Sequence, residues 1–486
     1  MRLNEVLETC GLPMLENDLD VTGISNNHIE IQQGNIFAAL PGARHHGIEF
    51  ASSAIDNGAV AILTDVNGAS QILTEVPIIV VEDPRLSMAF FARVIYGNPF
   101  SSLLTIGVTG TNGKTTTTHM IANALQANSF TPLLIGTLGF RLKNEYTKSA
   151  RTTPESVALY EEVSHAKSNG ADSVVMEVSS HALVLNRVAG ITFDVAVFTG
   201  LSPDHLDFHH TMEDYYQAKK QLFDPAHSKC AIICIDDEWG RRLQSEIQIP
   251  VITYTTNQPK ANWILNKYAA TNIGVADIEI INDGASIEAQ ISIPGVFNAA
   301  NAIATLACGE FLNLDRSSVV SSLAYTSVKG RLERIDIGQD FTVIVDYAHS
   351  PDAVEQVLKI GREIAGDRKI ITVLGCGGDR DSAKRPLMGK IAASNSDIFV
   401  ATDDNPRTED ANAIREQMLS DVTKDDYVIE IGDRQAAIHY AIKHASPGDC
   451  IMILGKGHEI GQEIQGFVHP FDDSQVAIEA LNAHIA

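Results

Sequence analysis

The stretch Leu103-Leu-Thr-Ile-Gly-Val-Thr-Gly-Thr-Asn-Gly-Lys-Thr-Thr-Thr-Thr118 decides the fold of this chain. Its apolar first part predicts a buried strand over 103–108, and the residues after Gly113 predict a helix over 114–127. Glycines between a strand and a helix let backbone N–H groups approach an anion, and the helix dipole favours the same charge. Lys114 can reach the β- and γ-phosphates of a nucleotide, and the Thr115 hydroxyl can bind Mg²⁺. The spacing of the glycines departs from the strict phosphate-loop pattern, so a plain glycine turn is the alternative.

Short apolar runs alternate with helical stretches on both sides of this loop. This alternation predicts an α/β fold, with doubly wound, mostly parallel sheets that carry helices on both faces. The run at 77–81 predicts a buried parallel strand, and the more polar stretch 255–293 predicts an antiparallel addition. The other expected strands are 35–40, 60–63, 133–135, 173–176, 195–198, 231–235, 341–345, 370–374, 398–402 and 450–454.

The length of 486 residues is about three times the roughly 150 residues of a typical domain. The turn Gly97-Asn98-Pro99 predicts a first boundary near residue 100, and a further unit begins near Arg331. We therefore expect a smaller α/β domain over 1–100, a central phosphate-loop ATPase domain over 101–330 and a Rossmann-like domain over 331–486.

Composition excludes several classes of protein. The net charge of −25 disfavours binding to nucleic acid or to an anionic membrane surface. No run of about 18 apolar residues predicts a membrane span, and the first residues do not resemble a signal peptide. Six scattered cysteines do not suggest a disulfide framework. We expect a cytoplasmic monomer that acts on small molecules.

Three further residues are candidates for chemistry near the loop. Glu177 directly follows the expected strand 173–176, where a carboxylate could hold Mg²⁺ or simply be solvated. His205 follows the strand 195–198, although a single histidine is more often a packing residue. Lys219 alone would be interpreted as a surface lysine.

Taken together, the motifs resemble those of the Mur ligase family, in matching order from about residue 20 to the end. The matching segments are Thr109-Gly-Thr-Asn-Gly-Lys-Thr-Thr116, Glu177-Val-Ser-Ser-His181, Asp204-His-Leu-Asp207, Pro294-Gly-Val-Phe-Asn-Ala-Ala-Asn301, Asp346-Tyr-Ala-His349 and Gly455-Lys-Gly-His-Glu459. The resemblance implies an ATP-dependent ligase of peptidoglycan precursor synthesis, with a UDP-binding N-terminal domain, a central ATPase domain and a C-terminal domain for the incoming amino acid.

The family resemblance also implies roles for individual residues. Lys114, His205 and Lys219 are the expected catalytic residues, and Lys219 matches the lysine that the family carbamylates; the adjacent Lys220 is the alternative assignment. The expected Mg²⁺ ligands are Thr115 and Glu177 for one ion, His205 for a second ion, and carbamylated Lys219. The expected ATP contacts are Gly110, Thr111, Asn112, Gly113, Lys114, Thr115, Thr116, Asn301, Arg331 and Asp346.

Two segments, Cys376-Gly-Gly-Asp-Arg380-Asp and Asp404-Asn-Pro-Arg407, narrow the resemblance to the family member that adds meso-diaminopimelate to UDP-N-acetylmuramoyl-L-alanyl-D-glutamate. The expected contacts to the UDP-muramoyl-dipeptide are Ser25, Arg44, Thr152, Thr153, Ser179 and Arg187. The expected contacts to diaminopimelate are Arg380, Asp404, Asn405, Pro406, Arg407, Gly455 and Glu459.

Three alternatives stay open at this point. The chain could add lysine instead of diaminopimelate, or it could resemble folylpolyglutamate synthase, which shares the ATPase core. It could also be a regulatory nucleotide-binding module without ligase chemistry. For Arg407, the alternative to a substrate contact is a surface salt bridge with Asp404 or Glu409.

Overall fold

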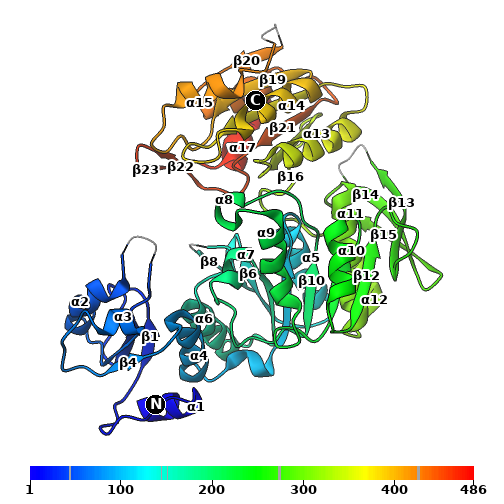
Figure 1. The fold of residues 1–486 in the computed structure, drawn as a ribbon. Helices are drawn as coiled ribbons and strands as arrows, with labels where there is room; N and C mark the ends of the chain where they lie inside the picture. The colour runs from blue at the N-terminus through cyan, green and yellow to red at the C-terminus, as the bar shows by residue number, and fades with distance from the viewer. Residues whose placement is uncertain (43–44, 144, 150, 272–274, 424–426, 486) are drawn as a thin grey trace. The chain divides into compact units, whose positions relative to one another are not determined.

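The computed structural model describes residues 1–42, 45–143, 145–149, 151–271, 275–423 and 427–485 (Figure 1). Contacts between residues divide the chain into two compact units. The first unit comprises Met1–Trp263 and Ala304–Val319, and the second comprises Ile264–Ile303 and Val320–Ala486. The division into domains at 1–100, 101–330 and 331–486 stays a prediction.

The N-terminal part of the first unit is a small parallel sheet in the order β1-β2-β3-β4. The helix α4 packs against β1, β2 and β3. The run at 77–81 is not the buried strand that we expected: β4 is an edge strand with a neighbour on one side only, and Val80 is 45% exposed. The elements are α1 (Leu3–Thr9), β1 (Gly23–Ser25), β2 (Asn35–Ala38), α2 (Ala51–Asp56), β3 (Ala61–Thr64), α3 (Val66–Ala69), β4 (Ile78–Val80) and α4 (Pro84–Ile95).

The larger sheet of the first unit confirms the predicted doubly wound arrangement. Its strands lie in the order β12-β11-β10-β5-β9-β6-β7-β8, and those from β12 to β6 are parallel. The strand before the phosphate loop, β5, therefore lies in the middle of the sheet. The elements are β5 (Leu104–Thr109), α5 (Lys114–Ala127), β6 (Pro132–Gly136), β7 (Gly139–Leu142), β8 (Glu145–Thr147), α6 (Ser156–Ser168), β9 (Ser173–Glu177), α7 (Ser180–Val184), β10 (Val195–Phe198), α8 (Leu206–His209), α9 (Met212–Lys220), β11 (Ala231–Cys234), α10 (Glu238–Glu246) and β12 (Val251–Thr255).

The polar stretch after β12 forms the antiparallel addition that its sequence predicted. The strands β14 and β15 pair antiparallel along their whole length. Buried and exposed residues alternate along β15, because only one face of this ladder is covered. The elements here are β13 (Trp263–Ala270), β14 (Ala276–Asn282), β15 (Ala285–Ile291), α11 (Val296–Phe311) and α12 (Arg316–Leu323).

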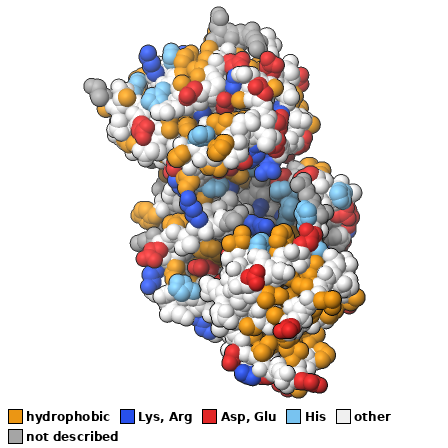
Figure 2. Space-filling model, turned by 90° about the vertical axis from the view of Figure 1, so that its left-hand side faces the viewer, with side chains coloured by type: hydrophobic (Ala, Val, Ile, Leu, Met, Phe, Trp, Pro, Cys, Tyr) orange, Lys and Arg blue, Asp and Glu red, His pale blue; other side chains and the backbone are white. Residues whose placement is uncertain are grey.

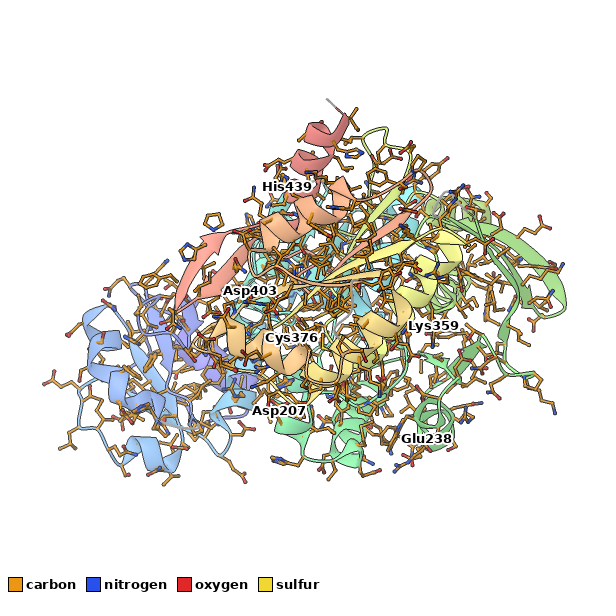
Figure 3. The ribbon with its side chains drawn as sticks, turned by 90° about the horizontal axis from the view of Figure 1, so that it is seen from above. Asp207, Glu238, Lys359, Cys376, Asp403 and His439 are labelled. Atoms are coloured by element: carbon orange, nitrogen blue, oxygen red, sulfur yellow. The ribbon has the colours of Figure 1, made fainter. Side chains whose placement is uncertain are left out.

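The C-terminal sheet has the order β16-β17-β21-β18-β19-β20, and only β16 runs antiparallel. The helices α13, α14 and α15 form one layer beside it, and α16 and α17 form another. Register partners Cys376 and Asp403 end the neighbouring strands β18 and β19 (Figure 3). The elements are β16 (Glu333–Ile335), β17 (Thr342–Asp346), α13 (Pro351–Ala365), β18 (Ile370–Cys376), α14 (Lys384–Asn395), β19 (Ile398–Asp403), α15 (Ala411–Met418), β20 (Val428–Glu430), α16 (Arg434–Lys443), β21 (Cys450–Leu454), β22 (Gly461–Ile464), β23 (Phe467–Pro470) and α17 (Asp473–Ile485).

A fully buried ion pair joins the two helices of the second layer. The side chains of Arg434 and Asp473 are both 0% exposed, and two hydrogen bonds of 2.7 Å connect them. We expect Arg434→Met to lower the free energy of unfolding by about 3–5 kcal/mol, because it leaves a buried carboxylate without its partner. Urea denaturation measures this, and Arg434→Met combined with Asp473→Leu should recover most of the loss. Equal losses in both variants would contradict the explanation.

The six cysteines lie in the described part of the chain and are all free, and all but Cys10 are buried. This agrees with the expectation that they form no disulfide framework. Among the described residues, no helix is both long and apolar enough to cross a membrane. On the face drawn in Figure 2, acidic side chains are scattered among basic and apolar ones. The surplus negative charge is thus spread over this face.

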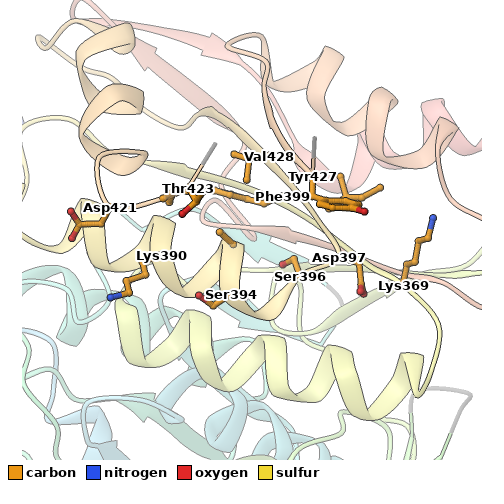
Figure 4. A pocket seen from close by; sticks show the side chains of 13 residues that line it. Lys369, Lys390, Ser394, Ser396, Asp397, Phe399, Asp421, Thr423, Tyr427 and Val428 are labelled. Carbon is orange, nitrogen blue, oxygen red and sulfur yellow. The ribbon is translucent and has the colours of Figure 1, made fainter. Parts of the chain in front are cut away.

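A cavity of about 610 Å³ lies at the amino ends of β18, β19 and β20 (Figure 4). Residues just before each strand line it, among them Lys369, Asp397 and Tyr427. None of the residues predicted to bind diaminopimelate lines this cavity, because they follow the carboxyl ends of β18, β19 and β21.

Candidate functional site

The phosphate loop joins β5 to α5 through two glycines with left-handed or related backbone angles. Gly113, which caps α5, has φ 85° and Gly110 has φ 151°. A side chain at Gly110 would overlap the hydroxyl of Thr199, so the loop packs tightly on the end of β10. Thr199 also donates a hydrogen bond of 2.6 Å to the carbonyl of Asn112. Thr115 and Thr116 are buried in the first turn of α5.

Two lysine ammonium groups converge on one carbonyl of this loop. Lys114 Nζ lies 2.9 Å from Gly110 O and 2.8 Å from Thr111 O. Lys219 Nζ lies 2.8 Å from the same Gly110 O, and 4.7 Å from the centre of the Tyr215 ring. Burial, followed by the nearby charge of Lys114, holds the pKa of Lys219 well below its ordinary value. The Lys219 side chain therefore loses its proton, and becomes a neutral amine, more readily than an ordinary lysine does.

The helix α9 explains why Lys219 faces the loop and Lys220 does not. The hydroxyl of Thr211 caps the helix by accepting from Asp214 N, and the lysines occupy the last turn, where cations are favoured. Lys219 is 1% exposed, whereas Lys220 forms an ion pair of 2.7 Å with Glu246 at the surface. Of the two adjacent lysines, Lys219 is thus buried at the loop and Lys220 lies at the surface.

Glu177 ends β9, directly beside the loop strand, and its register partner in β5 is Val108. The side chain is 1% exposed, and its two oxygens accept hydrogen bonds from the backbone N–H (2.8 Å) and the hydroxyl (3.1 Å) of Thr137. Thr137 follows the carboxyl end of β6, and sequence reasoning missed it. The apolar run before it was the available signal, because polar residues just past buried parallel strands gather at one sheet edge.

His205 lies in a cluster of aromatic side chains. Its ring centre is 5.0 Å from that of His181, which stacks on Phe208 at 4.1 Å. Burial lowers the pKa of His205 and lowers that of His209 to about 4, which favours neutral imidazoles with lone pairs available for binding. His209 Nε2 lies 2.8 Å from the hydroxyl of Ser180.

Most of the residues predicted to contact the UDP-muramoyl-dipeptide come together beside Glu177. Thr153 is 0% exposed; its hydroxyl donates to Glu177 O (2.9 Å) and lies 3.2 Å from Ser179 Oγ. Thr152 Oγ1 lies 3.2 Å from Thr137 Oγ1, and Arg187 donates to Thr153 O at 3.1 Å. Ser25 lies apart, at the end of β1, where its hydroxyl accepts from Asn27 N at 3.0 Å. Arg44 lies outside the described residues.

Glu155 organises an arginine cluster that sequence reasoning missed. It pairs with Arg85 at 2.9 Å, with Arg187 at 3.0 Å and with Arg151. Three guanidinium groups around one carboxylate leave a positive surplus next to Thr152 and Thr153, in a protein whose overall charge is −25. Burial lowers the pKa of Arg187, but a guanidinium stays charged at neutral pH.

The remaining residues predicted to bind ATP lie in the second unit. Asp346 ends β17 and accepts from Leu332 N (2.7 Å) and Ala348 N (2.8 Å), while burial raises its pKa. The guanidinium of Arg331 stacks on the Tyr347 ring at 4.6 Å. Asn301 is 3% exposed and donates to Asn298 Oδ1 at 3.1 Å.

The residues predicted to bind diaminopimelate follow β18, β19 and β21 of the second unit. The backbone of Arg407 has φ 52° and pairs with the β22–β23 hairpin through Glu463 O (2.9 Å) and Gln465 N (2.7 Å). Its guanidinium donates to Gly378 O at 2.6 Å and pairs with Glu463 at 3.3 Å. The ion-pair partner of Arg407 is thus Glu463 and neither Asp404 nor Glu409, and Glu409 pairs with Arg385.

Glycines at the end of β18 and just after it bring the backbone close to the Asp404-Asn-Pro-Arg407 segment. A side chain at Gly375 would approach Thr402 O to 2.7 Å, and one at Gly378 would overlap Pro406 O. At Gly377 the nearest atom would be Arg407 Nη1, at 3.1 Å. Arg380 is exposed in the same loop, and a side chain at Gly455 would approach Asp404 Oδ2 to 2.8 Å. The segment and its two flanking loops thus form one close-packed group.

The predicted metal ligands belong to four different chemical types. Among the described residues, no three His, Cys, Asp or Glu side chains are grouped so that they could hold a metal ion. The predicted set instead combines one carboxylate, one imidazole, a hydroxyl and a modified lysine. The buried carboxylate of Glu177 and the Thr115 hydroxyl are oxygen donors, which a hard cation such as Mg²⁺ prefers.

Family models match the chain over most of its length. The match to "Mur ligase family, catalytic domain" covers residues 20–95, that to "Mur ligase middle domain" covers 108–309, and that to "Mur ligase, glutamate ligase domain" covers 330–457. The UDP-N-acetylmuramoyl-L-alanyl-D-glutamate–2,6-diaminopimelate ligase of Streptomyces coelicolor is 43% identical over 99% of this chain and 96% of its own length. The chain belongs to the Mur ligase family.

Solved structures agree with this membership of the Mur ligases. A structure of a UDP-N-acetylmuramoyl-L-alanyl-D-glutamate–2,6-diaminopimelate ligase is 30% identical with a TM-score of 0.73, and covers 100% of both chains. The MurF ligase from Thermotoga maritima in complex with ADP is 18% identical with a TM-score of 0.66, and covers 96% of this chain and 98% of its own. The second likeness supports the shared fold.

Proposed function

We propose that this Mur ligase joins meso-2,6-diaminopimelate to UDP-N-acetylmuramoyl-L-alanyl-D-glutamate at the expense of ATP. The identity of 43% to a ligase with that name, over 99% of the chain, carries the proposal. In the reaction, a substrate carboxylate oxygen takes the γ-phosphoryl group and ADP leaves. The amine of diaminopimelate then attacks the acyl phosphate carbon and loses a proton, and the tetrahedral intermediate expels phosphate. One ATP is consumed for each amide formed.

The phosphate loop supplies the charge that this transfer needs. A carboxylate and a triphosphate repel each other, so cations and N–H donors must neutralise the approach. We assign the loop residues Gly110 to Thr116 to the phosphates of ATP, with Lys114 at the transferred group. Asn301, Arg331 and Asp346 are assigned to the rest of the nucleotide. The domains over 1–100, 101–330 and 331–486 would then bind UDP, ATP and the amino acid.

Mg²⁺ fits the residues beside the loop. Thr115 and Glu177 would hold one Mg²⁺ and His205 a second, with carbamylated Lys219 as a further ligand. The bound cations would neutralise the phosphate oxygens. The support is the buried Glu177 carboxylate, whose two oxygens receive hydrogen bonds from Thr137 alone among the described residues. The low pKa of Lys219 favours the neutral amine that reacts with carbon dioxide.

The remaining predicted residues are assigned to the two other substrates, the UDP-muramoyl-dipeptide and diaminopimelate. Thr152, Thr153, Ser179 and Arg187 lie beside Glu177, and we assign them to the muramoyl dipeptide, with Ser25 and Arg44 assigned to its UDP end. Arg380, Asp404, Asn405, Pro406, Arg407, Gly455 and Glu459 are assigned to diaminopimelate. Free thiols suit a reducing compartment, so we infer a cytoplasmic enzyme that acts on small molecules as a monomer.

The choice between diaminopimelate and lysine tests the proposal most directly. Diaminopimelate carries a second carboxylate, and a guanidinium can hold a carboxylate through two parallel hydrogen bonds. Arg407→Ala should lower kcat/KM for diaminopimelate about 10²-fold or more, because truncating one member of a buried charged pair costs roughly 2–5 kcal/mol. The activity with lysine, which has no second carboxylate, should change far less.

Phosphate release from ATP, measured with UDP-N-acetylmuramoyl-L-alanyl-D-glutamate and either amino acid, gives the rates. Arg368→Ala removes an exposed arginine of the same unit and should match the unmodified enzyme. If Arg407→Ala loses the same factor with both amino acids, specificity is set elsewhere. Phosphate release that requires neither amino acid would reject the ligase function and favour a regulatory module.

A further inference from the structure

Lys456 is a fully buried lysine to which no role has been assigned. Its side chain is 0% exposed, between Gly455 at φ 112° and Gly457 at φ 51°. A buried ammonium is tolerated only when polar groups surround it. Lys456 Nζ lies 3.0 Å from Asn405 Oδ1 and 3.1 Å from Glu459 Oε2. Both partners belong to the group predicted to bind the amino acid.

The three side chains close a triangle of hydrogen bonds. Asn405 Nδ2 donates to Glu459 Oε2 at 2.7 Å, so this one carboxylate oxygen accepts from both Asn405 and Lys456. Asn405 Oδ1 also accepts from Glu463 N at 2.9 Å. The Glu459 side chain is 30% exposed, and among the described residues no donor is recorded for Oε1. The triangle therefore fixes one oxygen of Glu459 and leaves the other for a ligand.

The loop around Lys456 is also held by contacts of its backbone. Gly455 N donates to Asp346 O at 3.1 Å, and Glu459 N donates to Lys456 O at 3.0 Å. Gly457 also packs on Tyr347, where a Cβ would come to 2.7 Å of the tyrosine Cβ. Since the backbone already anchors the loop, the ammonium acts chiefly on Asn405 and Glu459.

We propose that Lys456 is a positioning residue for the amino acid substrate. Its ammonium holds Asn405 and Glu459 so that the second oxygen of Glu459 accepts a hydrogen bond from the substrate's ammonium group. This inference rests on the proposed function, because it takes an amino acid as the ligand of the Asp404–Arg407 group. Lys456 itself touches no reacting atom.

The test is the Michaelis constant of each substrate in Lys456→Met, which keeps the length of the side chain and removes its charge and donors. We expect KM for diaminopimelate to rise about 10-fold or more, as for the loss of a hydrogen bond between charged groups. The KM for ATP and the kcat should change by less than about threefold, since neither depends on Glu459. Lys359→Met is the matched control, because Lys359 is an exposed lysine of α13 (Figure 3).

A double-mutant cycle separates positioning from a merely structural effect. If Lys456 acts through Glu459, then Lys456→Met should add little to the KM increase of Glu459→Gln, because contacting residues are not additive. Lys456→Gln, which keeps a donor for Asn405, replaces Lys456→Met in the cycle if the methionine variant does not fold. Increases that multiply, or a KM that rises equally for all three substrates, would overturn the inference. Failure of the unmodified enzyme to use diaminopimelate would instead reject the proposed function.

Discussion

Replacing Lys219 by alanine should nearly abolish amide formation. The side chain is buried against Gly110 O, and its pKa is well below the ordinary value, so the neutral amine can add to carbon dioxide. The neutral nitrogen forms a bond to carbon and releases one proton, which gives a carbamate anion. Alanine cannot form this anion, and added bicarbonate should therefore not restore phosphate release. Steady-state kinetics at saturating substrates measures the loss.

The adjacent lysine provides the control for this experiment. Lys220 pairs with Glu246 at 2.7 Å, away from the loop, so Lys220→Ala should retain nearly all activity. Native mass spectrometry should show the extra mass of one bound carbon dioxide, which disappears in Lys219→Ala. A fully active enzyme with an unmodified Lys219 would contradict the carbamate.

Replacing Lys114 by alanine should slow catalysis more than it weakens ATP binding. Its ammonium lies at the carbonyls of Gly110 and Thr111, at the start of α5, where the helix dipole also favours anions. Charge on the transferred phosphoryl group develops most in the transition state, and one preorganised contact of this kind contributes about 10²–10³ in rate. We therefore expect kcat to fall by that factor, with a smaller change in the dissociation constant of ATP.

Calorimetric titration with ATP, together with single-turnover rates, separates the two effects. Lys167→Ala is the control, because Lys167 is an exposed lysine near the end of α6. A variant of Lys114 with normal kcat would show that this lysine only stabilises the turn.

The large sheets were predictable because their strands are continuous apolar runs. The strands β5, β9, β10 and β11 are almost wholly buried, and their ends agree with the sequence prediction to within a residue or two. The hairpin strands β8 and β23 were missed because they are only three and four residues long and all of their residues are exposed. The edge position of β4 also escaped prediction, since a local pattern does not show how many neighbours a strand has.

The candidate site was predictable where a motif lies within one segment. The phosphate loop and Glu177 each follow a strand, and neighbouring parallel strands carry them to the same sheet edge. The positions of Lys456 and Glu463 were not predictable, because their partners are distant in sequence: 51 residues separate Lys456 from Asn405. Lys219 is buried and Lys220 lies at the surface because of the way in which α9 packs, and the sequence alone does not reveal this packing.

The packing of the glycines at and after the end of β18 limits how the choice of amino acid could evolve or be engineered. Any side chain at Gly375 or Gly378 would press on the backbone next to Asp404 and Arg407, so these two positions are closed to variation. At Gly377 an added methyl group would come closest to the end of the Arg407 side chain, at 3.1 Å from Nη1. Selection for use of a different amino acid substrate should therefore first yield substitutions at Gly377 and Arg407. Gly375 and Gly378 should remain unchanged in all of the selected variants.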